Sequence, residues 1–410
     1  QLLLLLSAFC CEAFVGSSYP TQKLVNWRAN DFNRKQQRQQ LQSYIWQLGS
    51  AVSPPPPSSS SSWSSSSFPE GENTDDADHH YNPNTPVGRM RRRKVRIYNQ
   101  RKTRGTIILM TLWYVLSVAY NIFSKRVLNM APEMAWTAAW AQMAFGLLYV
   151  FPIWAAGWRI RPQVSIQDVR KKILPVALIH SLVHVGGVVS MGAGAVSFTY
   201  IVKATEPAIS AFLAALILNS FLPIPVYLTL IPVIAGVSLA SVSELSFSAK
   251  AFNYAMLSNV ASASRGIVSK KTMNNRVGKN LNAMNLYAVL TILSTLVLFP
   301  VAAWKEGSVW ASTMKRLADS GRLTSYLTQT LLAALSYYTY NEVSFMALDN
   351  IDALSHALAS TLRRVFIITS SMVVFGNKMT PLGALGSAMA VGGALLYSAA
   401  KHHYRKKKAV

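Results

Sequence analysis

Residues 280–304 read NLNAMNLYAVLTILSTLVLFPVAAW, and no side chain among them is charged. A helix of about 20 apolar residues crosses the hydrocarbon core of a bilayer, so this stretch predicts a transmembrane helix. The whole chain has the same character, since 51% of its 410 residues are hydrophobic and 14% are charged. Soluble domains carry roughly 25% charged residues. The composition therefore excludes an ordinary soluble enzyme and indicates a membrane protein.

Similar apolar stretches recur toward both ends of the chain. The uncharged ones are residues 105–124, 134–158, 173–202, 207–243 and 379–400. The third and fourth of these are together long enough for three helices. Spans interrupted by charged residues are 251–273, 327–348 and 351–375. The pattern predicts an all-α polytopic membrane protein with ten transmembrane helices.

An internal similarity divides these helices into two sets of five. When Pro225 is aligned with Pro381, Gly236 falls on Gly392. Two copies of an odd number of helices must enter the bilayer in opposite orientations, so we expect two inverted five-helix repeats. Such repeats place a binding site near the middle of the membrane, where the two copies meet. Basic residues are concentrated in the loops on the side of both termini, which agrees with an even number of helices.

The regions outside the helical domain differ sharply in composition. Residues 1–14 resemble a signal-peptide leader, and residues 15–88 combine a transit-peptide-like stretch with a Pro/Ser-rich segment that we expect to be disordered. Residues 89–104 form a basic juxtamembrane segment, residues 105–400 the ten-helix domain, and residues 401–410 a basic tail. The leader predicts targeting to a plastid envelope, as in algae with complex plastids; an ordinary surface tail is the alternative.

The basic segment has two interpretations. A dense run of Lys and Arg can bind nucleic acid, but this one adjoins an apolar span, which favours contact with membrane lipid. We therefore expect no nucleic-acid partner. The only cysteines, Cys10 and Cys11, lie in the leader. Because carboxylates are also few, we expect neither a metal site nor a cofactor.

Four cations lie well inside apolar spans, and they are Lys203, Arg265, Arg363 and Arg364. A cation at the bilayer centre costs at least about 2.5–3.5 kcal/mol, so these side chains should face a polar interior. Glu206 and Glu342 are the acids available to balance them. Two positive charges then remain, which matches a phosphate monoester of about −1.5 to −2. A purely structural network of ion pairs is the alternative interpretation.

Neutral polar residues at similar depth can add hydrogen-bond donors. They are Ser197, Thr199, Tyr337, Tyr338 and Tyr340. His180 and His184 lie one helical turn apart and can face one cavity; for His180 alone, a structural role is favoured. Guanidinium groups and lysine are the side chains that proteins use to bind phosphate.

Three stretches together resemble the plastidic phosphate translocators, the triose-phosphate/phosphate type of the drug/metabolite transporter superfamily. They are Lys203-Ala204-Thr205-Glu206-Pro207, Ser264-Arg265-Gly266, and Tyr340-Asn341-Glu342 leading to Arg363-Arg364-Val365. The resemblance covers about Thr106 to Ala400. It implies a ten-helix antiporter that exchanges inorganic phosphate for phosphorylated three-carbon metabolites in a plastid envelope.

The resemblance also implies roles for individual residues. Lys203, Arg363 and Arg364 would hold the phosphate, with a hydroxyl donated by Tyr338. The residues expected at the opposite end of the substrate are His184 and Arg265.

The chain departs from the family pattern in three places. Arg363 stands where the family usually has lysine, and Tyr200 stands where a histidine is usual. Hydroxyl residues and asparagine are usual where this chain has Gly186, Gly187 and Val188. These departures leave substrate choice open.

A nucleotide-sugar or other sugar-phosphate carrier is therefore one alternative, since small residues would suit a larger ligand. A membrane-embedded phosphotransferase is a distant alternative, because it would need paired carboxylates or an activated nucleophile. We expect a transporter rather than an enzyme.

Overall fold

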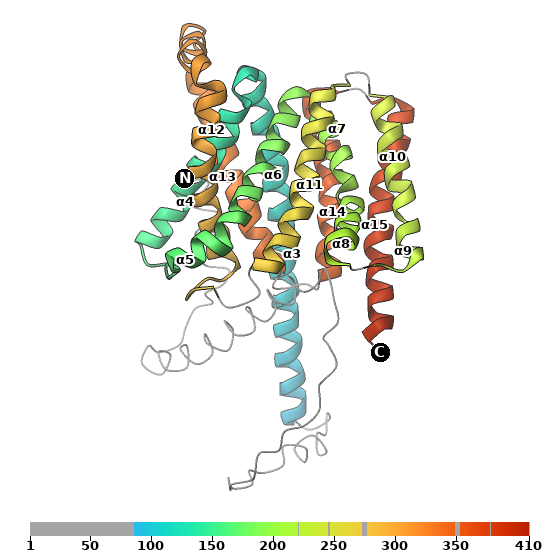
Figure 1. Ribbon diagram of the computed structural model, residues 1–410. Helices are drawn as coiled ribbons and strands as arrows, with labels where there is room; N and C mark the ends of the chain where they lie inside the picture. Colours follow the sequence, from blue (N-terminus) through green and yellow to red (C-terminus); the bar gives the residue numbers. More distant parts are fainter. Residues whose placement is uncertain are drawn as a thin grey trace. The chain divides into compact units, whose positions relative to one another are not determined.

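The computed structural model describes residues 86–219, 221–244, 247–272, 277–348, 353–377 and 379–409. The expected leader and nearly all of the Pro/Ser-rich segment lie outside these ranges. The described chain is built of helices (Figure 1), and its β pairing is limited to an isolated antiparallel bridge between Gln163 and Lys279. The all-helical class predicted from hydropathy is therefore confirmed.

The first half of the described chain contains α3 (Pro86–Met130), η2 (Pro132–Met134), α4 (Ala135–Ala155), α5 (Ile166–Asp168), the π-helical η3 (Val169–Ile173), α6 (Leu174–Ala193), α7 (Val196–Val202), η4 (Lys203–Thr205), α8 (Glu206–Leu218), α9 (Ile224–Leu228) and α10 (Leu230–Val242). The second half contains α11 (Ala249–Thr272), α12 (Ala283–Asp319), α13 (Leu323–Leu348), α14 (Ala353–Phe375) and α15 (Pro381–Ala409). From Leu109 onward these helices belong to one compact unit.

Eight stretches among the described residues are long and apolar enough to cross a membrane. They are Thr103–Met130, Pro132–Ala155, Ile166–Ala193, Val196–Leu218, Ile224–Val242, Ala283–Asp319, Ser355–Phe375 and Pro381–Tyr404. Helices α11 and α13 have the length but lie outside this set. Both were expected to be interrupted by charge, because they carry Arg265 and Glu342. The count of ten crossing helices thus depends on these two.

The span Val196–Leu218 is broken in its middle. Helix α7 ends at Val202, a 3-10 turn covers Lys203–Thr205, and α8 begins at Glu206. Pro207 explains the break, because proline has no N–H to donate and its ring clashes with the preceding turn. A short 3-10 stretch inside a longer helix often marks a functional position.

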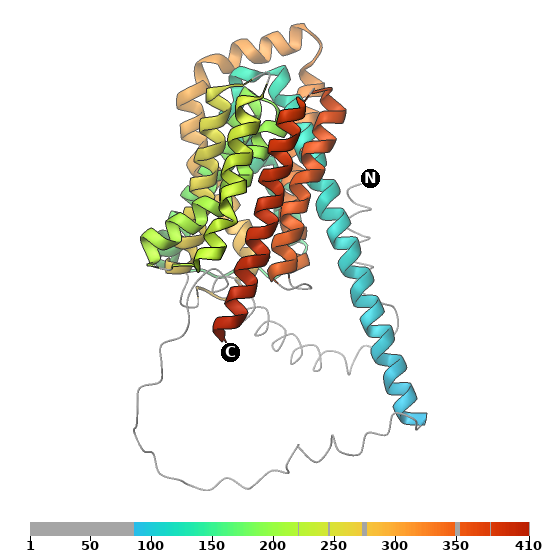
Figure 2. The same ribbon diagram turned by 90° about the vertical axis from the view of Figure 1, so that its right-hand side faces the viewer.

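Helices α10 and α15 cross through their glycines and lie side by side in Figures 1 and 2. A β-carbon on Gly236 would lie 2.5 Å from the Gly386 carbonyl oxygen, and one on Gly386 would lie 2.6 Å from the Gly236 carbonyl oxygen. The contact is reciprocal, and the helices run antiparallel, since Gly393 lies against Val233 and Gly383 against Ser243. Gly236 is thus paired with Gly386.

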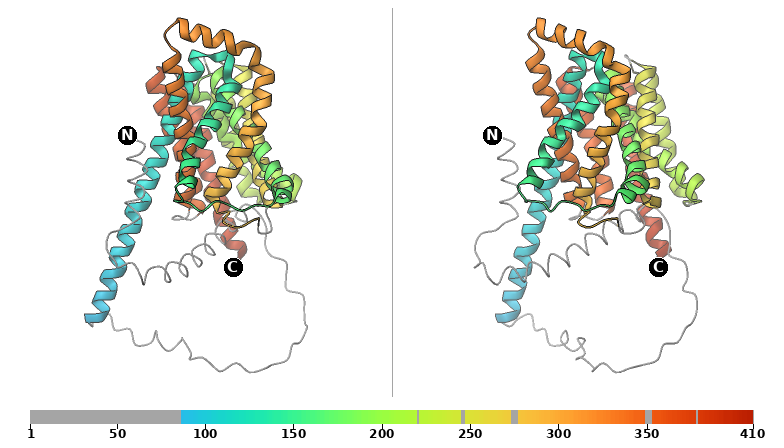
Figure 3. Two further views of the ribbon diagram at one scale, coloured as in Figure 1. Left: turned by 90° about the vertical axis from the view of Figure 1, so that its left-hand side faces the viewer. Right: turned by 60° about the vertical axis from the view of Figure 1, so that its left-hand side comes forward.

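Helix α12 continues beyond its apolar part and covers the beginning of α4, as its orange C-terminal half shows in Figures 2 and 3. The buried Glu306 carboxylate accepts hydrogen bonds from the backbone N–H groups of Trp136 and Thr137, at 2.9 and 2.8 Å. The first N–H groups of a helix have no partner within it, so Glu306 caps α4. Trp310 and Thr313 extend this contact through bonds to Thr137 and Glu133.

Candidate functional site

The break between α7 and α8 brings Lys203 and Glu206 together at the middle of one span. Because the Glu206 N–H bonds to the Lys203 carbonyl in the 3-10 turn, it is not available to the Val202 carbonyl. That carbonyl accepts instead from the Asn259 side-chain amide, at 3.0 Å, and from the Thr205 hydroxyl, at 2.9 Å. Side-chain groups thus stabilise the irregular backbone beside Lys203.

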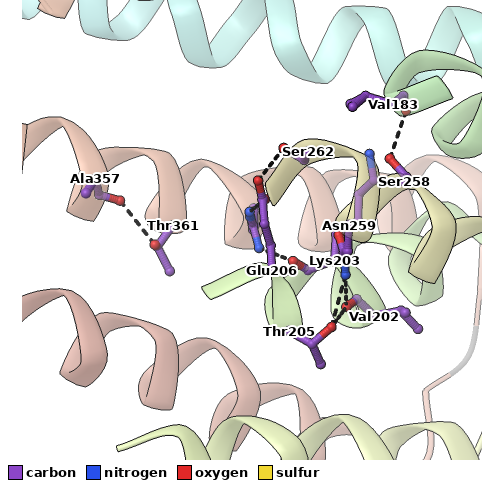
Figure 4. Close-up of polar contacts among 11 residues, drawn as sticks. Val183, Val202, Lys203, Thr205, Glu206, Ser258, Asn259, Ser262, Ala357 and Thr361 are labelled. Atoms are coloured by element: carbon purple, nitrogen blue, oxygen red, sulfur yellow. Dashed lines mark hydrogen bonds and ion pairs between the residues drawn. The ribbon is translucent and has the colours of Figure 1, made fainter. Parts of the chain in front are cut away.

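Helix α11 supplies the partners of this break (Figure 4). Asn259 Nδ2 donates also to Thr205 Oγ1, at 3.0 Å. One turn further along α11, Ser262 Oγ donates to Glu206 Oε1 at 2.5 Å. Ser258 bonds to the Val183 carbonyl of α6. One face of α11 therefore fixes α6, the break and the first turn of α8.

Arg364, on α14, is held by opposite charge. Its Nη2 atom donates to Glu206 Oε2 at 2.6 Å, with side-chain exposures of 14% for Arg364 and 30% for Glu206. Its Nη1 atom donates to the Lys203 carbonyl oxygen. The ion pair therefore joins α14 to the break in the first half of the chain.

Arg363 is held differently, by aromatic rings. Its guanidinium carbon lies 5.2 Å from the Trp113 ring centroid and 5.4 Å from that of Tyr340. Its Nη1 atom donates to Ser117 Oγ at 3.2 Å. The Nε atom is buried without an acceptor among the described residues. Arg363 thus lies between α3 and α13 and is not neutralised by a carboxylate in the described structure.

Arg265 and the two histidines form a neighbouring polar group. Arg265 Nη1 lies 2.8 Å from His180 Nδ1. The buried His184 ring packs against Tyr337, with ring centroids 4.2 Å apart. The Nε2 atoms of both histidines lack a hydrogen-bond partner in the described part of the chain.

The Lys203 ammonium lies next to Gly187 of α6. A β-carbon at residue 187 would lie 3.0 Å from Lys203 Nζ, so Gly187 leaves room for this charge. Tyr200 is nearby, with its ring centroid 5.9 Å from Nζ. We find no hydrogen bond or ion pair of Nζ within the described residues. Aromatic rings connect these groups, because Tyr340, which contacts Arg363, packs on Tyr337, and Tyr337 packs on His184. We call Lys203, Glu206, Arg265, Arg363 and Arg364 the cation cluster.

The structure does not bring Tyr338 and Glu342 into this cluster, contrary to our expectation. Glu342 is buried and forms an ion pair with Arg159, from the loop after α4. Tyr338 is fully buried, and its ring packs against Tyr149 and Tyr287, 5.4 and 5.1 Å away. Neighbouring residues of a helix point in different directions, and on α13 the face of Tyr337 and Tyr340 meets the cations.

The charge balance changes accordingly. Because Glu342 is already paired with Arg159, Glu206 is the one carboxylate of the described residues that pairs with a cation of this cluster, namely Arg364. The cluster has a surplus of three positive charges rather than two. A buried surplus of this kind is unfavourable without an anion.

The departures at Gly186 and Gly187 have structural explanations. A β-carbon on Gly186 would lie 2.8 Å from the Tyr254 carbonyl oxygen, so this glycine allows close packing of α6 on α11. Gly187 accommodates Lys203, as described above. Both spaces are occupied by protein atoms, so neither glycine enlarges a cavity for a bigger ligand.

Sequence reasoning missed Asn259, Ser262 and Trp113. A Ser and an Asn one turn apart on an apolar helix, facing a proline-broken span, are a signal that could have identified the first two. No local signal identifies Trp113, because its contact with Arg363 joins helices far apart in the chain.

Comparison with known proteins identifies the family of the chain that carries this site. Residues 105–398 match the Triose-phosphate Transporter family. The chain belongs to this family. It is 39% identical over 296 residues to glucose-6-phosphate/phosphate translocator 1, chloroplastic, of Arabidopsis thaliana, covering 72% of this chain and 74% of that one.

Two further members of the triose-phosphate transporter family are similarly related. The xylulose 5-phosphate/phosphate translocator of Arabidopsis thaliana is 37% identical over 308 residues, covering 75% of this chain and 72% of the relative. The triose phosphate/phosphate translocator of Pisum sativum is 35% identical over 298 residues, covering 72% of each chain. Both relatives are chloroplastic. Like the other members of the family, this chain is a transporter and not an enzyme.

Proposed function

We propose that this chain is an antiporter that exchanges inorganic phosphate for triose phosphate or related three-carbon phosphates by alternating access. The surplus of positive charge around Lys203 carries the proposal. A phosphate monoester brings about −1.5 to −2 charges and three acceptor oxygens. A three-carbon phosphate that also carries a carboxylate, such as 3-phosphoglycerate, would balance the third cation, whereas triose phosphate and inorganic phosphate would leave it in part uncompensated.

Lys203, Arg363 and Arg364 are the proposed phosphate ligands. The Lys203 ammonium and Arg363 Nε have hydrogen-bonding capacity to spare in the described structure. Guanidinium groups bind phosphate oxygens in pairs, and lysine adds a compact charge. We assign the opposite end of the substrate to Arg265 and His184, and the neutral hydroxyl beside the phosphate to Tyr340 in place of Tyr338.

The proposed architecture has ten crossing helices in two inverted halves. Helices α11 and α13 are as long as the other spans, and their polar residues are explained by contacts with the cluster and with Arg159. The reciprocal contact of Gly236 and Gly386 has the local twofold symmetry that two inverted halves would produce. Inverted repeats of this kind bind substrate between their halves.

The same charge surplus explains why exchange would be obligatory. Closing an empty site would enclose three uncompensated cations, which is costly in a low-dielectric surrounding. A bound dianion or trianion lowers that cost, so only the loaded carrier would change its orientation readily.

Reconstitution into liposomes tests this proposal. Labelled phosphate should enter vesicles preloaded with phosphate or triose phosphate and should not enter empty vesicles. Neutral replacements, K203Q and R364Q, should abolish this uptake in folded protein. Equal uptake into empty and loaded vesicles would contradict obligatory exchange, and full activity of both variants would contradict the assigned site.

A second candidate keeps the fold and enlarges the substrate. Relatives named for glucose 6-phosphate and xylulose 5-phosphate match the chain as well as those named for triose phosphate. Vesicles preloaded in turn with triose phosphate, 3-phosphoglycerate, xylulose 5-phosphate and glucose 6-phosphate would distinguish them. We expect the three-carbon compounds to support the fastest phosphate uptake, because Gly186 and Gly187 do not widen the site.

We assign the chain to a chloroplast envelope, in line with the names of its relatives. The bipartite leader of a complex plastid stays a prediction from residues 1–14 and 15–88. Imaging a full-length fluorescent fusion would test the assignment, and a signal outside the plastid would contradict it.

A further inference from the structure

The two adjacent arginines of α14 are held by different kinds of contact. Arg364 is paired with the carboxylate of Glu206 and with the Lys203 carbonyl. Arg363 lies over the rings of Trp113 and Tyr340 and touches the Ser117 hydroxyl. A carboxylate orients a cation and neutralises it, whereas an aromatic face orients it and leaves its net charge unchanged.

Trp113 is itself rigidly held. Its side chain is among the largest that are fully buried, and it packs with Leu109 and Val343. The His356 ring stacks on it, with centroids 4.9 Å apart and planes 13° apart. His356 Nε2 in turn lies 3.2 Å from the Ser344 hydroxyl of α13. The indole is therefore a fixed platform joined to both α13 and α14.

We propose that Trp113 is the positioning residue for Arg363, and that it holds this guanidinium over its indole so that a full positive charge faces the substrate. The inference deepens the proposed function and rests on it, since it assumes that Arg363 binds the phosphate. A planar, weakly hydrated guanidinium stacks on an aromatic face better than an ammonium does. The arginine at 363 and the indole at 113 thus act as one unit.

The Nε atom of Arg363, which lacks a hydrogen-bond acceptor among the described residues, is consistent with a guanidinium held ready for the substrate. With its guanidinium carbon over two rings and Nη1 bonded to Ser117, Arg363 keeps Nε without an acceptor in the described chain. A buried charged donor without a partner is rare in folded proteins and calls for an explanation. An incoming phosphate oxygen would supply the acceptor.

The test measures phosphate exchange kinetics and phosphate-dependent thermal stabilisation of W113L and W113F in the full chain. The matched control is W140L, because Trp140 also has a buried Nε1 without a partner and packs on Phe299, outside the cluster. Removing a cation–π contact should raise KM for phosphate by about fivefold in W113L, with a smaller rise in W113F. We expect kcat to stay within about twofold and W140L to keep the wild-type KM.

Coupling to Arg363 is measured with R363K and the double variant W113L/R363K. If the indole acts through the guanidinium, W113L should add little to the KM of R363K, so the two effects are not additive. Full additivity, or equal KM values for W113L and W140L, would overturn the proposal. If W113L fails to fold, the same comparison is made between W113F and W113F/R363K, and additivity there also overturns it.

Failure of this inference is distinguishable from failure of the proposed function. R363Q tests the latter directly. Loss of exchange in R363Q together with normal kinetics of W113L would refute the role of Trp113 and leave the antiporter intact. Normal exchange in both variants would refute the assignment of Arg363 to the phosphate as well.

Discussion

The Lys203 ammonium occupies the space that a side chain at Gly187 would take, since a β-carbon there would lie 3.0 Å from Nζ. This contact links α6 to the break between α7 and α8. It also explains why a small residue stands where the family usually has a larger one. The position of the ammonium therefore depends on residue 187.

The variant G187A should displace Lys203 without unfolding the protein, because the far end of a lysine side chain moves easily. Loss of a charge-assisted contact of about 1.4 kcal/mol corresponds to a roughly tenfold higher KM for phosphate. Exchange kinetics in liposomes measure this KM. G392A is the matched control, since nothing lies within 4 Å of a β-carbon at that position. A wild-type KM in G187A would contradict the prediction.

The variant E206Q should lower the maximal exchange rate without raising KM for phosphate. Arg364 would lose the partner that orients it, and one more positive charge would remain after phosphate binds. A hydrogen bond between charged groups contributes about 1.5–3 kcal/mol, so we expect at least a roughly tenfold loss of rate. D168N removes a carboxylate that pairs with Lys172 outside the cluster. Equal rates in E206Q and D168N would show that Glu206 has no such role.

The variant N259L should reduce stability, because it leaves the Val202 carbonyl with fewer partners at the break. Asn259 donates two hydrogen bonds there, to the Val202 carbonyl and to Thr205, and each contributes about 0.5–1.5 kcal/mol. The thermal unfolding temperature in detergent measures this effect. N253L is the control on the same helix, since Asn253 is exposed. A similar unfolding temperature for both variants would mean that Asn259 does not stabilise the break.

The ion pair of Arg159 with Glu342 should contribute to stability and not to phosphate affinity. Removing one partner of a buried pair costs about 3–5 kcal/mol, whereas replacing both with apolar residues is often neutral. R159L and E342L should each unfold at lower temperature, and R159L/E342L should recover most of the loss. KM for phosphate should be unchanged in the double variant. A higher KM for phosphate in the double variant would show that Glu342 belongs to the substrate site.

The class of the protein followed from the sequence for a simple reason. Apolar stretches such as 280–304 are transferred into lipid wherever they occur in the chain, so length and hydropathy suffice to predict helices across the membrane. The cost of a buried charge singled out Lys203, Arg265, Arg363 and Arg364 before any contact was known. Pro207, next to Glu206, marked the interruption at which two of the charged residues meet.

The tertiary structure alone decided which charges meet. Glu342 was expected to balance the cations of the apolar spans, yet its partner is Arg159, 183 positions away in sequence. Tyr338 and Tyr340 are equally polar in sequence, but a rotation of about 100° per residue sends them to different surroundings. Hydropathy measures the transfer of a side chain from water to lipid. The rotation of each helix and the neighbour it faces are set by the packing of all the helices together.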